Sequence, residues 1–187
     1  MLIKTELSPK LEYKNSDYAF NKSDSNMICG YASVFGVVDD QQDIVLQGAF
    51  GQSLLAHLTN RKIALLWQHM SDKPIGVIEQ LLEDEYGLYI KARILDDIRY
   101  GQEALSLIRS QAVCGLSIGF SPTKYHYRAD NVRVLEEVSL WEVSVVTFPA
   151  NRFASVAQLE KQCKKTQLLI LRLGRAINAV KARVNTN

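Results

Sequence analysis

Residues 113–120, with the sequence VCGLSIGF, have the two-residue alternation that is typical of a β-strand. Alternate side chains of a strand point to opposite faces, so the apolar residues at positions 116, 118 and 120 share one face. The other face carries Gly115, Ser117 and Gly119. Ser117 is therefore a hydroxyl between two glycines, which leaves room for another backbone to approach it. This pattern fits either a catalytic serine or a strand whose glycines admit a neighbouring element of the protein.

Strand-like and helical patterns alternate along the rest of the chain. Apolar runs between turn signals predict strands at 27–38, 62–68, 75–82, 87–95, 114–127, 131–139 and 140–148. Apolar residues at helical spacing predict helices at 48–58 and 98–110, the second capped by Asp96 or Asp97. A mostly β body with two helices favours a barrel or another α+β arrangement over a doubly wound sheet.

The charge of the chain is unevenly divided. The net charge is +2, yet residues 1–150 hold 14 basic and 19 acidic residues, and residues 151–187 hold eight basic residues and one acidic residue. Two explanations fit this asymmetry equally well. The tail contacts nucleic acid or an acidic protein surface, or its basic residues form the solvated face of a helix. We expect a flexible segment at 1–26, a folded domain at 27–156 and a basic amphipathic helical tail at 157–187.

The sequence lacks the patterns of secreted, membrane-spanning and metal-dependent proteins. The start of the chain has no continuous apolar stretch before a small-residue cleavage site, so no signal peptide is expected. The longest apolar run near the end is far too short to cross a bilayer. Neither HExxH, CxxC nor a glycine-rich phosphate loop occurs. We therefore expect a cytoplasmic chain without a membrane contact, a metal or a cofactor.

A serine hydroxyl needs a general base to become a nucleophile, and the sequence has three histidines. His57 falls within a predicted helix, and His126 lies between two tyrosines in a strand that should be half exposed. His69 follows the apolar run at 63–67 and precedes a polar turn. Considered alone, His69 fits a structural histidine better. Considered with Ser117, it is the best candidate for the base.

A catalytic histidine also needs a partner that fixes its tautomer and stabilises its cation. Glu142 lies in the apolar stretch LWEVSVVTF, where a buried carboxylate requires a hydrogen-bonded partner such as an imidazolium. An edge-facing glutamate paired with a lysine or arginine fits the same pattern. Rivals for the orienting role are the acidic residues of the loop DDQQD and another histidine: Asp39, Asp40, Asp43 and His126.

Cys114 is an alternative nucleophile three residues before Ser117, because thiolates attack carbonyl groups well. By alternation it shares the face of Leu116 and Ile118, so the role of a small buried hydrophobe is favoured. The pattern Gly-x-Ser-x-Gly at 115–119 is not followed by a predicted helix. That disfavours the strand–turn–helix elbow of the α/β-hydrolases.

Five segments, in this order, resemble the prohead protease family of tailed bacteriophages and prophages. They are GYASVF at 30–35, DIV and GAF within 43–50, LLWQH and IG within 65–76, GLSIGF at 115–120 and LWEVSVVTFPAN at 140–151. Each segment is weak alone, but the ordered set is specific and covers roughly residues 28–156.

The resemblance implies a serine endopeptidase related to the herpesvirus assembly proteases. The implied fold is a closed, assemblin-like β-barrel flanked by helices, with a C-terminal helical extension. The matching positions carry over Ser117 as nucleophile, His69 as general base and Glu142 as third member, where the related viral enzymes use a second histidine. Neither a cofactor nor a metal is implied.

The resemblance also implies partners and a location. The substrates would be the scaffold protein or the scaffold-like segment of the major capsid protein, and then the enzyme itself, as a homo-oligomer. The enzyme would act in the host cytoplasm, inside the immature capsid. The main alternative is a catalytically inactive assembly factor with the same fold, and a third candidate is a hydrolase of small esters.

Overall fold

The computed structural model describes residues 26–59 and 62–157. The segments 1–25 and 158–187, where the sequence predicts a flexible start and a basic helical tail, lie outside the described residues. No helix among the described residues has both the length and the apolar character needed to span a bilayer.

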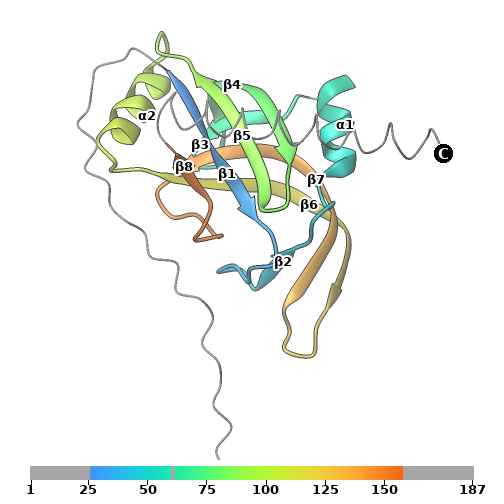
Figure 1. Cartoon of the computed structure of the whole chain (residues 1–187). Coiled ribbons are helices and arrows are strands. Elements are labelled where there is room, and N and C mark those ends of the chain that lie inside the picture. Colours follow the sequence, from blue (N-terminus) through green and yellow to red (C-terminus); the bar gives the residue numbers. More distant parts are fainter. Residues whose placement is uncertain (1–25, 60–61, 158–187) are drawn as a thin grey trace, which may run out of the picture.

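Seven strands of the described residues close into a β-barrel (Figure 1). In chain order they are β1 (Met27–Val34), β3 (Ala64–Trp67), β4 (Met70–Glu83), β5 (Gly87–Ile94), β6 (Gly115–Tyr127), β7 (Arg133–Val146) and β8 (Ser155–Ala157). Around the barrel the order is β7-β3-β4-β5-β1-β8-β6, and β6 pairs again with β7 to complete the ring. A short strand, β2 (Asp43–Val45), pairs in parallel with the first residues of β7. The predicted closed barrel is confirmed.

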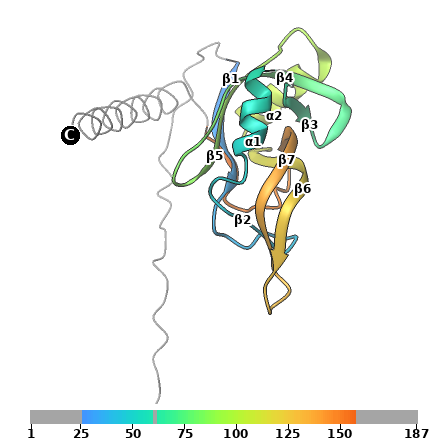
Figure 2. The same ribbon diagram turned by 90° about the vertical axis from the view of Figure 1, so that its right-hand side faces the viewer.

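Two helices of the described residues pack on the barrel wall, as predicted. Helix α1 (Gly51–Thr59) contacts β7 and β4, and α2 (Arg99–Arg109) contacts β4. Figure 1 shows them at opposite ends of the barrel, and Figure 2 shows α1 lying beside β7. The predicted cap of α2 is wrong. Ile98 is the N-cap residue and makes no side-chain capping bond, while Asp96 and Asp97 are exposed ahead of it.

The structure corrects the predicted strands in three places. The strands predicted at 131–139 and 140–148 are one continuous strand, β7, which covers residues 133–146, because no turn residue separates them. Strand β4 begins at Met70 and not at residue 75, and Pro74 is tolerated because the register against β3 shifts there. The sequence does not predict β2 and β8, which are three residues long and form only by pairing with distant strands.

The apolar interior of the barrel decides which side chains of β6 and β7 face outward. Leu116 on β6 and Val143 and Val145 on β7 are fully buried in the main core. Because alternate residues of a strand face opposite sides, Ser117 and Glu142 lie on the outer face of the barrel wall. The predicted division of the β6 sequence into an apolar face and a face of small residues is therefore confirmed.

Candidate active site

The pairing of β6 with β7 brings the candidate serine and glutamate onto one surface. In this antiparallel ladder Ser117 lies opposite Ser144, and Gly119 lies opposite Glu142. Directly opposed residues share a face of the sheet, and so do residues two apart on one strand. These four positions therefore form one cluster on the outer face of the barrel.

His69 reaches this cluster from the tight turn between β3 and β4. Strand β3 runs parallel to β7, with Leu66 opposite Ser144. Gln68 and His69 follow with φ angles of 53° and 58°, in the left-handed region that residues other than glycine seldom adopt. The Gln68 amide donates to the Val145 carbonyl oxygen at 3.0 Å, and the His69 amide donates to Ser144 Oγ at 3.0 Å. These two bonds hold the histidine beside β7.

The imidazole of His69 is bonded to the carboxylate of Glu142. The atoms His69 Nδ1 and Glu142 Oε1 lie 2.6 Å apart, and the two side chains are 45% and 11% exposed. This hydrogen bond raises the pKa of His69 above its ordinary value, and partial burial of the ring opposes the rise without cancelling it. A mostly buried carboxylate thus fixes one nitrogen of a ring that remains accessible. Such an arrangement can support proton transfer at the other nitrogen.

Ser117 lies next to this pair with an unengaged hydroxyl. The residue is 8% exposed, and its hydroxyl makes no hydrogen bond within residues 26–59 and 62–157. Among the described residues, the only fully buried side-chain nitrogen or oxygen without a hydrogen-bond partner is the Tyr89 hydroxyl. Ser117 Oγ has no partner there either, so it is not fully buried and keeps some contact with solvent. The structure does not join Ser117 to His69 by a hydrogen bond, because the described bonds of His69 go to Glu142 and Ser144.

The glycines on either side of Ser117 make room for groups of the protein itself. A Cβ atom at Gly119 would lie 2.3 Å from Glu142 Oε1. A Cβ atom at Gly115 would lie 2.7 Å from the Val146 carbonyl oxygen and 2.8 Å from Pro149 Cδ. Both glycines therefore make room for neighbouring groups of the protein. For Gly119 that neighbour is the carboxylate of the candidate site.

The other two histidines are engaged away from this cluster. His57 is buried in α1, and its Nδ1 accepts a hydrogen bond from the Ile63 amide at 2.9 Å. Burial lowers the pKa of His57, with a smaller contribution from the charge of Lys62. His126 Nδ1 lies 2.7 Å from Glu136 Oε1 on the exposed hairpin of β6 and β7. Among the described residues, neither of these two rings is hydrogen-bonded to Ser117 or Glu142.

The rival carboxylates of the loop DDQQD also have other partners. Asp43 forms a two-pronged ion pair with Arg133, with oxygen–nitrogen distances of 2.7 and 2.6 Å. Asp40 pairs with Arg152 at 2.8 Å, and Asp39 accepts two backbone amide bonds within its own loop. Among the described residues, no group of three or more His, Cys, Asp or Glu side chains is placed to hold a metal ion.

Cys114 differs from its predicted role as a small buried residue, because its side chain is exposed. The alternation of strand faces does not extend to it, since β6 begins one residue later at Gly115. Its carbonyl oxygen accepts a hydrogen bond from the Val156 amide at 2.8 Å, so the backbone is anchored while the thiol stays at the surface. The thiol therefore remains an accessible alternative nucleophile.

Ser144 is the residue of this cluster that sequence reasoning missed. Its side chain is fully buried, and its hydroxyl donates to Glu142 Oε2 at 2.7 Å while accepting from the His69 amide. Its position two residues after Glu142 was a usable signal, because both side chains must share one face of a strand. A hydroxyl two residues away on the same strand face is close enough to donate a hydrogen bond to a buried carboxylate.

The raised pKa of His69 predicts how the His69–Glu142 pair contributes to stability as the pH changes. A group whose pKa is higher in the folded state binds its proton more tightly there. Its stabilising contribution is complete below the unfolded pKa and is lost as the pH rises through the folded pKa. We therefore expect the difference in unfolding free energy between the wild type and Glu142→Gln to be largest below the ordinary pKa of a histidine and to shrink as the pH rises through the raised pKa of His69.

This difference is measured by urea unfolding of both proteins across the pH series. Both proteins keep His57 and His126, so titration of those two side chains cancels in the difference. A difference that stayed constant or grew with pH would show that Glu142 does not hold the proton of His69.

The chain is similar in sequence to a family of phage proteins and to two individual phage proteins. The sequence profile described as caudovirus prohead serine protease matches residues 10–168. The prohead protease of Enterobacteria phage HK97 is 37% identical over 134 residues, which are 70% of this chain and 59% of that protein. A capsid polyprotein of Pseudomonas phage PAJU2 is 31% identical over 106 residues, which are 52% of this chain and 16% of that protein. The chain thus spans 59% of the first relative's length and a small part of the second.

The fold also has a counterpart among solved structures. The capsid assembly protease of bacteriophage T4 superposes with a TM-score of 0.56 at 17% sequence identity. The match covers 66% of this chain and 82% of that one. The two proteins therefore share a barrel fold, although few of their residues are identical.

Proposed function

Because this chain belongs to the caudovirus prohead serine protease family, we propose that it is a serine endopeptidase that acts in the maturation of phage capsids. In this proposal Ser117 is the nucleophile, His69 is the general base and Glu142 orients His69. The observation that carries the proposal is the 2.6 Å contact between His69 Nδ1 and Glu142 Oε1. This contact is close to Ser117. Ser144 lies opposite Ser117 on the neighbouring strand, and it bonds to both His69 and Glu142.

The proposed chemistry is acyl transfer through Ser117. Glu142 occupies Nδ1 of His69 and leaves Nε2 to remove the hydroxyl proton as Ser117 Oγ attacks the peptide carbonyl carbon. His69 then delivers this proton to the departing amine, and the acyl-enzyme remains on Ser117. A water molecule, deprotonated by His69, attacks the ester and regenerates the serine. The negative charge that Glu142 holds near the ring stabilises the imidazolium formed in each half.

The absence of a His69–Ser117 bond in the described residues is compatible with this mechanism. Catalytic hydrogen bonds are often long or misaligned without substrate and become short only in the substrate complex. The serine hydroxyl is free to rotate, since it has no partner among the described residues, and the histidine ring is 45% exposed. A bound peptide would exclude water from both groups and bring the two side chains into line.

Two observations support a capsid protein as the substrate. One relative with a similar sequence is a capsid polyprotein, and another is a prohead protease. We therefore propose that the chain cleaves a scaffold protein or the scaffold-like segment of its capsid protein, inside the immature capsid. Cleavage of further copies of the chain, and a homo-oligomeric state, are part of the same proposal.

Co-expression with the major capsid protein of the same phage tests this function. We expect intact-mass measurement to show a capsid protein shortened by one discrete segment when the wild type is present. The full-length mass should persist when the chain carries His69→Ala, because Ser117 then lacks its base. Full-length capsid protein in both cultures, with particles still assembled, would instead identify an inactive assembly factor.

A further inference from the structure

We propose that Ser144 is a positioning residue that fixes the orientation of His69 and Glu142, and this inference rests on the proposed function. The hydroxyl of Ser144 has contacts with both members of the pair. It donates to Glu142 Oε2 at 2.7 Å and accepts from the His69 amide at 3.0 Å. The side chain is fully buried, so these bonds form without competition from water.

The bonds of Ser144 complete a closed ring of hydrogen bonds. The His69 amide donates to Ser144, Ser144 donates to one oxygen of Glu142, and the other oxygen of Glu142 bonds the ring of His69. His69 is therefore held at two points, its backbone nitrogen and its imidazole Nδ1. Two attachment points define the direction of the ring, whereas the bond to Glu142 alone would let the ring and carboxylate swing together.

The turn that carries His69 explains why a hydroxyl is required at position 144. Gln68 and His69 both have left-handed backbone angles, with φ values of 53° and 58°. Residues with side chains adopt such angles only where surrounding bonds hold them. Gln68 is held by the bond of its amide to the Val145 carbonyl oxygen and by two bonds of its side chain to Thr147, at 2.9 and 3.3 Å. At His69 the bond that restrains the backbone is the one to Ser144 Oγ.

Ser144 is distinguished from the proposed nucleophile by its bonds and its burial. Its hydroxyl proton is directed at Glu142, and its oxygen already accepts the His69 amide. A peptide cannot reach a side chain that is 0% exposed, whereas Ser117, directly across the ladder, has an unpaired hydroxyl that touches solvent. Ser144 therefore acts through the His69–Glu142 pair and not on the substrate.

The test is the variant Ser144→Ala, examined by kinetics and by titration of the histidine. We expect kcat for cleavage of the capsid protein to fall about 10- to 100-fold with KM unchanged, because a misplaced base impairs chemistry and not binding. The pKa of His69, followed by the NMR signal of its ring, should fall toward its ordinary value as the bond to Glu142 loosens. The acidic limb of the pH–kcat profile should move to lower pH with it. Should the variant fail to fold, Ser144→Cys keeps a similar shape and only a weak donor.

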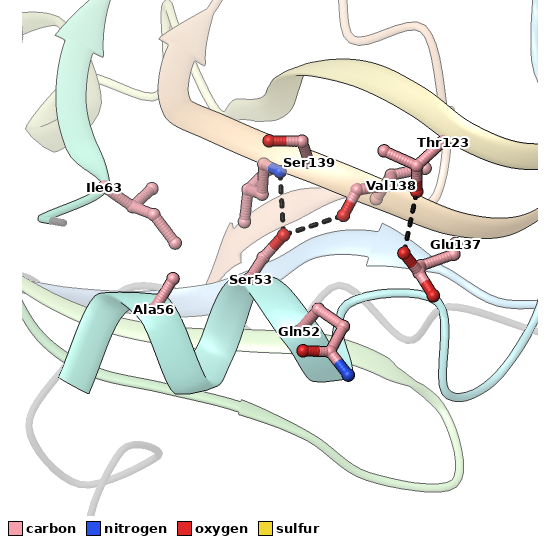
Figure 3. Close-up of a pocket in the computed structure, with 9 residues that line it drawn as sticks. Gln52, Ser53, Ala56, Ile63, Thr123, Glu137, Val138 and Ser139 are labelled. Atoms are coloured by element: carbon pink, nitrogen blue, oxygen red, sulfur yellow. Dashed lines mark hydrogen bonds between the residues drawn. The ribbon is translucent and has the colours of Figure 1, made fainter. Parts of the chain in front are cut away.

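Ser53→Ala is a matched control for the loss of a buried serine with two hydrogen bonds. Figure 3 shows Ser53 on α1, where its hydroxyl donates to the Val138 carbonyl oxygen at 2.7 Å and accepts from the Leu140 amide at 2.8 Å. Both partners belong to β7, the strand of Ser144, but their side chains lie in the main apolar core. We expect Ser53→Ala to lower the melting temperature at least as much as Ser144→Ala, and to leave kcat and the pKa of His69 unchanged.

Each outcome decides the role of Ser144 separately from the proposed function. If Ser144→Ala matched Ser53→Ala in kcat and in the pKa of His69, Ser144 would be merely structural and the inference would be wrong. A higher pKa of His69 in Ser144→Ala than in the wild type would also overturn the inference. It would show that the Ser144 hydroxyl only weakens Glu142 as a hydrogen-bond acceptor and does not position it. The titration needs no catalysis, so it remains decisive even if Ser117→Ala proved fully active and the proposed protease mechanism failed.

Discussion

We expect Ser117→Ala to lower kcat for cleavage of the capsid protein by at least about 10⁴-fold and to leave the protein folded. The expected loss is this large because the proposed acyl-enzyme cannot form without the hydroxyl oxygen, and only binding and orientation of the peptide remain. Ser117 Oγ makes no hydrogen bond among the described residues, so its removal should change the free energy of unfolding by less than about 0.5 kcal/mol. Single-turnover cleavage, followed by intact mass, and thermal unfolding measure the two effects on one sample.

Ser121→Ala is the matched control for this variant. It lies on the same strand, and its hydroxyl accepts a hydrogen bond from the exposed Trp141 indole at 3.1 Å, away from His69. Its cleavage rate should equal that of the wild type. Residual cleavage by Ser117→Ala at more than a tenth of the wild-type rate would contradict the assignment of the nucleophile. The exposed thiol of Cys114 would then be the next candidate, and Cys114→Ala would decide between them.

Local patterns in the sequence predict those parts of the site that depend on a single strand. Alternation along the β6 sequence places Ser117 on the face opposite Leu116, and the structure confirms that division. The apolar neighbours of Glu142 indicate a buried carboxylate in need of a partner, and the structure pairs it with His69. Both predictions succeed because the period of a strand and the energetic requirement of a buried charge are properties of a few adjacent residues.

Features that depend on distant contacts escaped prediction. The register that sets Ser117 opposite Ser144 follows from closure of the whole barrel, and the left-handed angles of Gln68 and His69 follow from bonds to β7. Strands β2 and β8 are likewise too short to be recognised without their partners. The role of Ser144 required all of this information, because it is defined by two bonds to groups on different strands and turns. Tertiary structure, and not local preference, positions His69 beside Glu142.

We expect Gly119→Ala to reduce activity strongly and stability only a little, whereas a core substitution mainly reduces stability. Its Cβ atom would lie 2.3 Å from Oε1, 2.8 Å from Cγ and 2.9 Å from Cδ of Glu142. These atoms belong to the flexible end of a side chain, so the carboxylate moves aside while the strand keeps its place. The displaced carboxylate loses its bonds to His69 and Ser144. We expect kcat to fall at least about 100-fold, since the base is no longer oriented, while unfolding becomes easier by only about 1–3 kcal/mol.

Gly115→Ala is the control that carries the same substitution two residues earlier. Its Cβ atom would meet the Val146 carbonyl oxygen and the ring of Pro149, which are less able to move than a carboxylate and do not bond His69. We expect it to destabilise the protein more than Gly119→Ala does and to leave the pKa of His69 where it is. NMR titration of His69 in both variants, with urea unfolding, makes the comparison. Full activity in Gly119→Ala would mean that cleavage does not need Glu142 beside His69. Equal losses of stability and activity in both variants would mean that these glycines serve packing alone. A loss of activity confined to Gly119→Ala would mean that the lack of a side chain at position 119 is needed to keep His69 oriented by Glu142.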